Sequence, residues 1–387
     1  MPPKREGNQV LWAGEMERPG GETNSVYFNF TCPDPAAFVP RLRPFLLAFL
    51  VPAMRVGYPL QLEQPIDQTT LDNLMEWQAT MACWLPGKLR VVPIRCPIEP
   101  EPPKVIAQPR ALTAFSGGVD SCYTAYCHTV AEHTGEYRRT QLGAGLMVHG
   151  FDIPEQQAAV FDSAFQRSKQ ILDSLGIEAF QMRTNLKSLT TVFECDWGCE
   201  THGIWLAATL ACLEPFFAKV LIPSSYPFTA LRLPWGSNPI TDALFASGAT
   251  PVWHDGAAHH RLAKVSAMAQ HAGIQQGLRV CWQGSQLDRN CDRCFKCLAT
   301  LACYRLNGVH QPECYENPCQ IQNIARLALR TPSNRALFRV LHTEARRQRD
   351  NELVRALGKA LRRHARQKLR RKLKQLCLNP QTFFDQI

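Results

Sequence analysis

The sequence predicts an α/β protein built on a doubly wound parallel sheet. From about residue 105 to 310, short apolar runs alternate with stretches of helical periodicity, as strands alternate with helices. Within that region the apolar run 112–115 leads through a glycine turn directly into a helical pattern. We therefore predict a parallel domain at 105–310, preceded by a small α+β domain at 1–104 and followed by a basic helical extension at 311–387.

The composition is compatible with a large folded protein. Hydrophobic residues make up 45% of the 387, enough for a sizeable core. No apolar run is long enough to span a membrane, and the first residues lack a signal-peptide pattern, so we expect a cytoplasmic protein that does not bind membranes. Sixteen cysteines in such a chain indicate metal binding or burial rather than disulfides.

In the N-terminal domain, the predicted elements follow apolar periodicity. They are a strand at 26–30, a helix at 36–49 interrupted by prolines, a strand at 60–64, a helix from Thr69 to Trp84 and a strand at 88–94. The Pro-rich stretch 97–103 is predicted to be a stiff linker. No catalytic constellation is visible in this part of the sequence.

In the parallel domain, five strands are predicted, with helices between them. The strands are expected at 112–115, 145–149, 177–182, 218–222 and 250–253, and the later helices at 154–175 and 201–217. Because ligands of such sheets lie at the carboxyl ends of the strands, the residues that follow each strand belong to one rim. That rim includes the glycine turn, the segments 149–152 and 223–242, and His254 with Asp255.

The glycine turn, Ser116-Gly-Gly-Val-Asp-Ser121, has the properties of a phosphate-binding loop. Its glycines allow a close approach of the backbone to an anion, and the following helix start offers free N–H groups. Ser116 and Ser121 add hydroxyl donors, whereas Asp120 suits a first-turn cap or a handle for Mg²⁺. An ordinary strand-to-helix turn is the alternative.

The segment 223–242 is long, lacks periodicity and mixes aromatic with polar residues. A loop of this length inside a compact domain is usually functional. We predict a lid or wall that holds a planar substrate, with a purely structural loop as the alternative.

A second candidate cluster precedes the predicted helix at 201. Residues 194–202 contain three carboxylates, two thiols and His202. His202 could deprotonate an amine near neutral pH, because histidine titrates there. Helix capping by solvated carboxylates and a second metal site are the alternatives.

Four cysteines have the spacing of a metal site. Cys281, Cys291, Cys294 and Cys297 form a C-x9-C-x2-C-x2-C pattern whose thiolates can converge on one tetrahedral Zn²⁺. An iron–sulfur cluster would use the same ligands.

The basic character of the chain is concentrated near its C-terminus. Residues 326–375 hold 17 Lys or Arg and 3 Asp or Glu, a net charge of +14, against +10 for the whole chain. Leu353, Leu357, Leu361, Ala365, Leu369 and Leu373 recur every fourth residue and predict one amphipathic helix. Its basic face could bind tRNA through phosphates, dock on an acidic protein, or remain solvated.

The glycine turn resembles the pyrophosphate loop of the PP-loop (HUP-type) ATP pyrophosphatases, and Arg261-Leu-Ala-Lys264 resembles their segment with a phosphate-binding lysine. The resemblance implies an α/β fold of that type, ATP and Mg²⁺ as cofactors, and catalytic roles for Asp120, Lys264 and His202. The residues that it implies for nucleotide binding are Phe115, Ser116, Gly117, Gly118, Val119, Asp120, Ser121, Val148 and His149.

Together with the four cysteines, the turn is similar to 7-cyano-7-deazaguanine synthases of the queuosine pathway and their relatives. This resemblance covers about 105–310 and implies a Zn²⁺ site and adenylation of 7-carboxy-7-deazaguanine, followed by capture with ammonia to give an amide or nitrile. The chain departs from the synthases at His149-Gly150-Phe151, where they have Tyr-Gly-Gln, and at 201–203, where they have Arg-Asn. These changes leave the product open. Relatives in antiphage defence imply a protein amine as an alternative acceptor, and we expect a homodimer.

Overall fold

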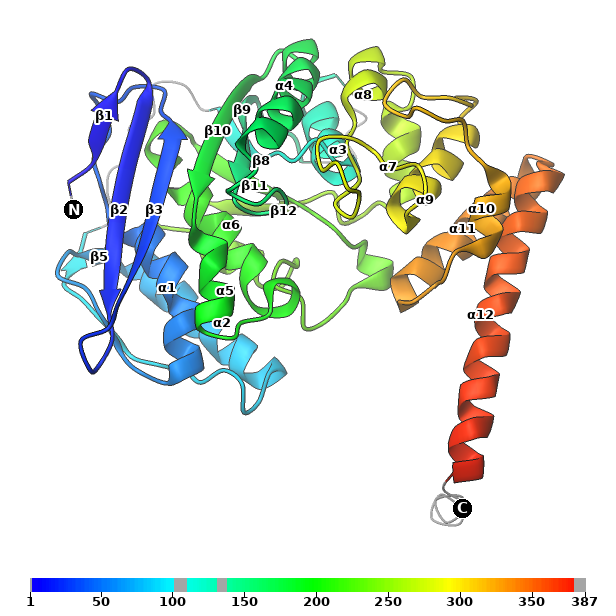
Figure 1. Ribbon diagram of the computed structural model, residues 1–387. Helices are drawn as coiled ribbons and strands as arrows, with labels where there is room; N and C mark the ends of the chain where they lie inside the picture. Colours follow the sequence, from blue (N-terminus) through cyan, green and yellow to red (C-terminus); the bar gives the residue numbers. More distant parts are fainter. Residues whose placement is uncertain (1, 101–109, 131–137, 379–387) are drawn as a thin grey trace.

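The protein is organised around one eight-stranded mixed sheet (Figure 1). The computed structural model describes residues 2–100, 110–130 and 138–378, and of 366–378 the backbone course alone. The strands lie across the sheet in the order β1 (Lys4–Glu6), β2 (Gln9–Glu17), β3 (Thr23–Thr31), β10 (Glu178–Thr184), β9 (Leu142–His149), β8 (Ala111–Ala114), β11 (Lys219–Pro223) and β12 (Val252–Asp255). The predicted α/β class is confirmed, although the sheet is mixed rather than wholly parallel.

Five neighbouring strands, β10-β9-β8-β11-β12, are parallel. From β8 the chain adds β9 and β10 on one side and then returns to add β11 and β12 on the other. The strand order therefore reverses between β8 and β11. Ligands of open α/β sheets bind in the crevice at such a switch point.

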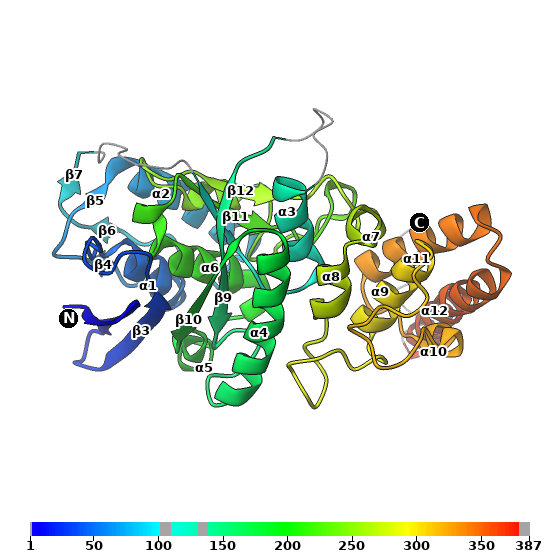
Figure 2. The same ribbon diagram turned by 90° about the horizontal axis from the view of Figure 1, so that it is seen from above.

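Helices cover both faces of the sheet (Figure 2). One face carries α1 (Arg43–Val56), α2 (Gln68–Trp84) and α6 (His202–Ala211), whose apolar residues form one core with that side of the strands. The other face carries α3 (Val119–Thr129), α4 (Ala158–Ser174), α7 (Arg261–Met268), α8 (Ala272–Gly277) and α9 (Phe295–Arg305), which share a second core. This is the two-sided burial that near-continuous apolar strands require.

The N-terminal region extends the central sheet. β3 pairs antiparallel with β10, and β2 and β1 continue outward from it. The prediction at 26–30 lies within β3, whereas β1 and β2 were missed. Two short sheets, β4 (Leu60–Gln61) with β6 (Ile94–Arg95) and β5 (Ile66–Asp67) with β7 (Ile98–Glu99), complete this part.

Several predicted boundaries in this region were wrong. The helix predicted at 36–49 is α1, which begins at Arg43 because Pro44 fits the first turn, and it continues past Pro52. α2 is capped by Asp67, which accepts from the Thr70 N–H, rather than by Thr69. Of the strand predicted at 88–94, only Ile94 is in a strand, β6 (Ile94–Arg95). The boundary at 104–105 and part of the linker lie outside the described residues.

In the parallel region, the prediction of which segments are helices and which are strands was correct, but the residues at which they begin and end differ from the prediction. The helix predicted at 154–175 is α4, and that predicted at 201–217 is α6. A π-turn at Trp197–Thr201 precedes α6, and a 3₁₀ turn at Glu214–Phe216 follows it. The remaining short helices are η1 (Leu186–Ser188), α5 (Leu189–Val192), η4 (Phe228–Ala230) and η5 (Asp242–Phe245).

The C-terminal helices pack beside α7 and α9. They are α10 (Ile321–Arg326), α11 (Pro332–Arg347) and α12 (Asn351–Leu378), of which α12 projects from the body (Figure 1). Leu353 and Leu357 are buried against the core and Leu361 is partly buried, as the apolar periodicity predicts, whereas Ala365 is exposed. The side chains of Leu369 and Leu373 lie outside the described part. Among the described helices, none has the length and apolar character needed to cross a membrane.

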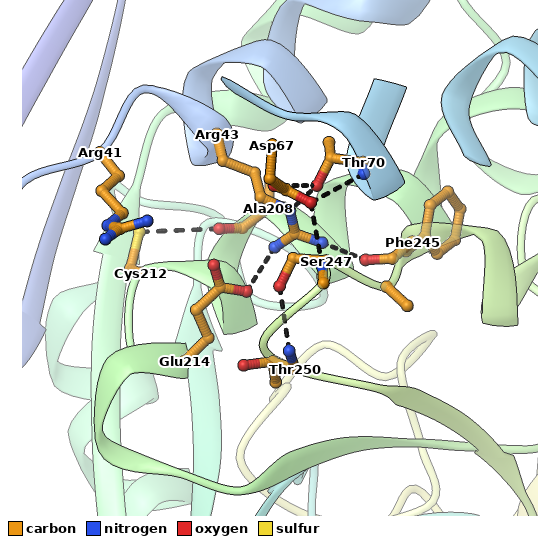
Figure 3. A network of polar contacts seen from close by, with 12 residues as sticks. Arg41, Arg43, Asp67, Thr70, Ala208, Cys212, Glu214, Phe245, Ser247 and Thr250 are labelled. Carbon is orange, nitrogen blue, oxygen red and sulfur yellow. Dashed lines mark hydrogen bonds and ion pairs between the residues drawn. The ribbon is translucent and has the colours of Figure 1, made fainter. Parts of the chain in front are cut away.

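A buried ionic network joins α1 to the segments that flank β11 and β12 (Figure 3). Arg43, 5% exposed, donates to Glu214 Oε2 at 2.5 Å, to the Phe245 carbonyl and to Thr70 Oγ1 at 3.2 Å. Asp67 lies beside it and accepts from Thr70 and from the Gly248 N–H. The network connects the first hundred residues to the segments around β11 and β12.

Candidate phosphate-binding site and cysteine cluster

The glycine turn follows β8 at the switch point of the sheet. Gly117 has φ +71°, and a Cβ there would lie 2.9 Å from Ser168 Oγ of α4, so glycine is required for both conformation and space. Ser121 braces the turn, because its hydroxyl accepts from the Ser116 N–H at 3.2 Å and donates to the Gly118 carbonyl at 3.1 Å. Ser116 is exposed at the mouth of the turn.

The start of α3 is suited to an anion. Gly118 is the N-cap and supplies no side chain, and the described structure has no side-chain cap at this helix. The first N–H groups of a helix have no partner within the helix, and the helix dipole adds partial positive charge. The turn and the first residues of α3, Val119 and Asp120, thus offer backbone donors to a bound phosphate.

The structure brings Lys264 and Asp120 together. Lys264 Nζ lies 2.7 Å from Asp120 Oδ1 and donates to the Ser224 carbonyl at 2.6 Å, and the lysine is only 2% exposed. Arg261 lies 3.7 Å from the other Asp120 oxygen. Burial alone would raise the pKa of Asp120, but the charges of Lys264 and Arg261 outweigh it and lower that pKa. A fixed ion pair therefore flanks the turn.

Arg279 holds the turn from the opposite side and was missed by the sequence analysis. Its backbone N–H donates to the Gly117 carbonyl at 2.8 Å, and its guanidinium donates to the Ser116 carbonyl at 3.2 Å and to the Leu287 carbonyl at 3.0 Å. It is 5% exposed. Its sole signal in the sequence is its position two residues before Cys281. That position points to a role at the turn only after the structure has shown that the turn and the cysteines are neighbours.

Further charged groups surround the same rim. Burial lowers the pKa of Lys296, at the start of α9, and the charge of Arg261 lowers it further, whereas Asp152 and Asp120 oppose the shift. Burial also lowers the pKa of Lys187, whose Nζ donates to the Phe151 carbonyl at 2.6 Å. Lys264, Arg261, Lys296 and Arg279 outnumber the acidic groups Asp120 and Asp152, which favours a polyanionic ligand.

The four predicted cysteines converge. The sulfurs of Cys281, Cys291, Cys294 and Cys297 all lie within 4.8 Å of one another, with Cys281–Cys294 and Cys291–Cys297 each at 3.9 Å. Zinc bound tetrahedrally at about 2.3 Å would place its sulfurs about 3.8 Å apart. The cluster could therefore hold a metal such as zinc.

The surroundings of the cysteines also suit thiolates. The N–H groups of Cys294 and Cys297 point at the sulfurs of Cys291 and Cys294, at 3.4 and 3.5 Å. Hydrogen bonds from Cys297 outweigh burial and lower the pKa of Cys294 to about 5. Cys294 also caps α9, where the helix dipole favours negative charge.

Val148 and His149 lie at the end of β9, on the predicted rim. His149 is turned inward: its ring stacks on Phe161 at 4.4 Å, its Nε2 contacts the Pro154 carbonyl at 3.0 Å, and it is 3% exposed. Its side chain is therefore engaged in the core rather than at the glycine turn, and Val148 is partly buried beside it.

His202 lies at the start of α6, within an aromatic group. Its Nδ1 is 3.2 Å from the Trp197 carbonyl, and its ring lies 5.0 Å from that of Trp235. Burial lowers the pKa of His202, so the imidazole is neutral at pH 7. Among the predicted capping carboxylates, Asp196 caps the π-turn and Glu200 pairs with Arg55.

The segment 223–242, called the wall segment below after its predicted role, is anchored at one end. Its second half is buried against the start of α6, where a Cβ on Gly203 would lie 1.8 Å from the Gly236 carbonyl oxygen. Its first half is more open and carries Tyr226, whose ring meets Trp235 at 5.4 Å. Aromatic faces and polar groups thus alternate along this side of the rim.

The chain matches no protein-family model, and neither a curated protein nor a solved structure is similar to it.

Proposed function

We propose that this protein is an ATP-dependent ligase of the PP-loop pyrophosphatase type, which adenylates a carboxylic acid and passes the acyl group to an amine. The observation that carries the proposal is the uncapped glycine turn at the switch point, flanked by the buried pair of Lys264 and Asp120. A carboxylate oxygen attacks the α-phosphorus, the bond between the α- and β-phosphates breaks, and pyrophosphate leaves. Lys264 and the amides of the turn stabilise the charge that develops.

The acid that we propose is 7-carboxy-7-deazaguanine, which rests on the resemblance to 7-cyano-7-deazaguanine synthases. Support from this chain is the aromatic wall of Tyr226, Trp235 and His202, which suits a planar ring. Ammonia as acceptor would give an amide or nitrile. A protein amine is the alternative acceptor.

The proposed reaction would involve two kinds of metal ion, Zn²⁺ and Mg²⁺. Zn²⁺ on the four cysteines would supply structure, since four protein ligands close its coordination. Mg²⁺ fits Asp120 less well, because both carboxylate oxygens already face cations, Lys264 and Arg261. Asp120 therefore orients Lys264, and Mg²⁺ would bind phosphate oxygens instead.

Pyrophosphate release from ATP, with the deazaguanine acid and ammonia, tests the proposal. We expect AMP and pyrophosphate in equal amounts, and a loss of about 10²–10³-fold in Lys264→Met, comparable to the removal of one oxyanion donor. Lys169→Met is the matched control, because Lys169 pairs with Asp173 on the exposed side of α4. ATP binding without AMP formation, whatever acid is offered, would reject the ligase and leave a nucleotide sensor.

The basic face of α12 favours a second function, binding of tRNA or another nucleic acid. Arg355, Lys359, Arg362 and Arg363 are exposed, opposite the buried face of the same helix. We expect a variant with these four residues changed to Glu to lose RNA retention on filters, and the wild-type affinity to fall steeply with salt. Equal retention by both proteins would count against this function. Substitution is preferable to deletion, because Leu353 and Leu357 belong to the core.

A further inference from the structure

A buried Asp–His pair joins the carboxyl end of β12 to the last residue of the segment 223–242, and no role has been assigned to it so far. His254 Nδ1 is 2.7 Å from Asp242 Oδ2, and the two side chains are 5% and 0% exposed. Asp242 also accepts from Ser237 Oγ at 2.7 Å and from the Asn238 N–H at 3.0 Å. Asp242 therefore accepts three hydrogen bonds, and the carboxylate oxygen that faces Nδ1 favours the imidazole tautomer with its proton on that nitrogen.

The other ring nitrogen of His254 has no partner. Nε2 is buried and makes no hydrogen bond to any described residue. Two more buried polar atoms without a partner come from the adjoining wall segment, Trp235 Nε1 and Thr241 Oγ1. Unpaired buried polar groups are costly, and in native proteins they indicate a water, an ion or a ligand.

The pair lies at the edge of the sheet that also carries the anchor of Lys264. In the sheet His254 is opposite Ile222 of β11, two residues before Ser224, whose carbonyl receives Lys264. Adjacent strands are about 4.8 Å apart, so His254 and the anchor of Lys264 share one edge of the rim. If the nucleotide lies at the ends of β9 and β8, as the proposed function implies, an acyl group on its α-phosphate would extend toward β11 and β12.

The charged groups around His254 come from several elements. Asp242 belongs to η5, Arg138 contacts the His254 carbonyl, and His202 at the start of α6 feels the charge of Asp242. Asp255, the next residue of β12, is directed to the opposite face, where it pairs with His128 and Thr124. His254 thus faces the wall segment, and its charged hydrogen-bond partner there is Asp242.

We propose that His254 is the base that accepts the proton of the attacking amine, a step that rests on the proposed ligase function. The amine nitrogen forms a bond to the acyl carbon, the bond from that carbon to the phosphate oxygen breaks, and AMP leaves with the electron pair. Nε2 takes the proton lost by the nitrogen and releases it to water. Asp242 stabilises the imidazolium that forms meanwhile, as in other Asp–His pairs.

Single-turnover rapid-quench experiments test this role. In His254→Gln we expect acyl-adenylate to form at the wild-type rate and then to accumulate, because its capture by the amine slows about 10²–10³-fold. His128→Gln is the matched control, since it alters a buried His–Asp pair on the other face of the same strand. Capture at the wild-type rate in His254→Gln overturns the proposal, as does an equal loss of both steps in a folded variant. His202→Gln discriminates further, because slowing of capture in that variant alone assigns the base to His202.

A readout that is independent of turnover uses the imidazole nitrogens of ¹⁵N-histidine-labelled protein. We expect His254 to carry its proton on Nδ1 and its Nε2 resonance to shift on addition of 5′-O-sulfamoyladenosine, a mimic of an adenylate. A proton resident on Nε2, or a resonance that saturating probe leaves unchanged, overturns the proposal. If the wild-type protein forms no acyl-adenylate, the ligase proposal fails, and the nitrogen resonances still decide whether His254 faces a ligand.

Discussion

At the scale of single residues, Gly117 decides whether the turn can form. Its φ of +71° disfavours any side chain, and Ser168 Oγ occupies the position that a Cβ would approach. Gly308 has nearly the same backbone, with φ +77°, but open space around it. Substitution of Gly308 by alanine therefore measures the cost of the left-handed backbone alone. The same substitution at Gly117 measures that cost together with the cost of the contact with Ser168.

We expect Gly308→Ala to cost about 1–2 kcal/mol of unfolding free energy, the price of a left-handed alanine. Gly117→Ala should cost more, and it should slow pyrophosphate release about 10²-fold because the phosphate donors are displaced. Urea melts and the release assay on both variants measure these effects. Equal stability and full activity of Gly117→Ala would show that the turn does not need its observed shape.

The residues that sequence reasoning found are those whose signal is local. The glycine turn and the four cysteines each lie within a short span, and a motif can be recognised there. Arg279 contacts a turn that lies 163 residues earlier in the chain, so no local motif indicates its role. Asp242 and His254 both belong to segments of the predicted rim, but the sequence does not show that their side chains pair. For His149 the position at the end of a strand was predicted correctly, and the structure adds that its ring stacks on Phe161, a contact that the sequence does not indicate.

At the scale of elements, the cysteine loop supports the glycine turn. Arg279 joins the two, since it contacts the carbonyls of Ser116 and Gly117 on one side and those of Cys281 and Leu287 on the other. Gly284 lies inside this loop, where a Cβ would be 3.2 Å from Cys291 Cβ. We therefore expect the loss of a metal from the cysteines to disturb the glycine turn and to weaken the proposed binding of ATP.

We expect about one zinc ion per chain, and its loss in Cys294→Ser, because structural zinc needs all four ligands. ATP affinity should fall in the same variant. Elemental analysis and calorimetry measure the two effects, with Cys83→Ser as control, since Cys83 is an exposed cysteine of α2. Metal content that is unchanged in Cys294→Ser would exclude this set of ligands, and iron in place of zinc would indicate a cluster.

Apolar periodicity predicted which segments form helices and which form strands, but it did not predict where each of them begins and ends. Pro40 and Pro44 interrupt the pattern of the helix predicted at 36–49, yet α1 has Pro44 in its first turn and continues past Pro52 in a buried environment. β2 was missed because its alternation is weak in sequence, and its pairing with β3 and the contact of Trp12 with Phe45 hold it. Tertiary packing therefore overrides local preference at these positions.

At the scale of the whole molecule, the N-terminal region and the parallel strands share one core. Phe28, Leu47 and Trp77 lie in the same apolar cluster as Leu112 and Trp205. Apolar periodicity shows which residues are buried but not against which strand, so this continuity was not predictable from the sequence. The Arg43 network adds a polar connection across the same junction (Figure 3).

We expect Arg43→Met to lower the free energy of unfolding by about 3–5 kcal/mol, because it leaves buried carboxylates without their cation. Arg41→Met is the matched control and should cost less than about 1 kcal/mol, since Arg41 pairs with Glu99 at the surface. Urea melts of the two variants measure the difference. Similar midpoints would show that the network contributes little to stability.

Glu214 gives the same junction a dependence on pH. Burial raises the pKa of Glu214, and although the charge of Arg43 opposes the shift, the negative charge of Asp67 raises the pKa further. A folded-state pKa above the unfolded value of about 4.3 means that the folded state holds the proton more tightly. The resulting stabilisation is complete below that unfolded value and is lost as pH rises through the raised pKa. Glu214→Gln removes this titration, so the advantage of the wild-type protein over the variant should be larger at pH 4 than at pH 7, and a constant difference between their urea midpoints would contradict the raised pKa.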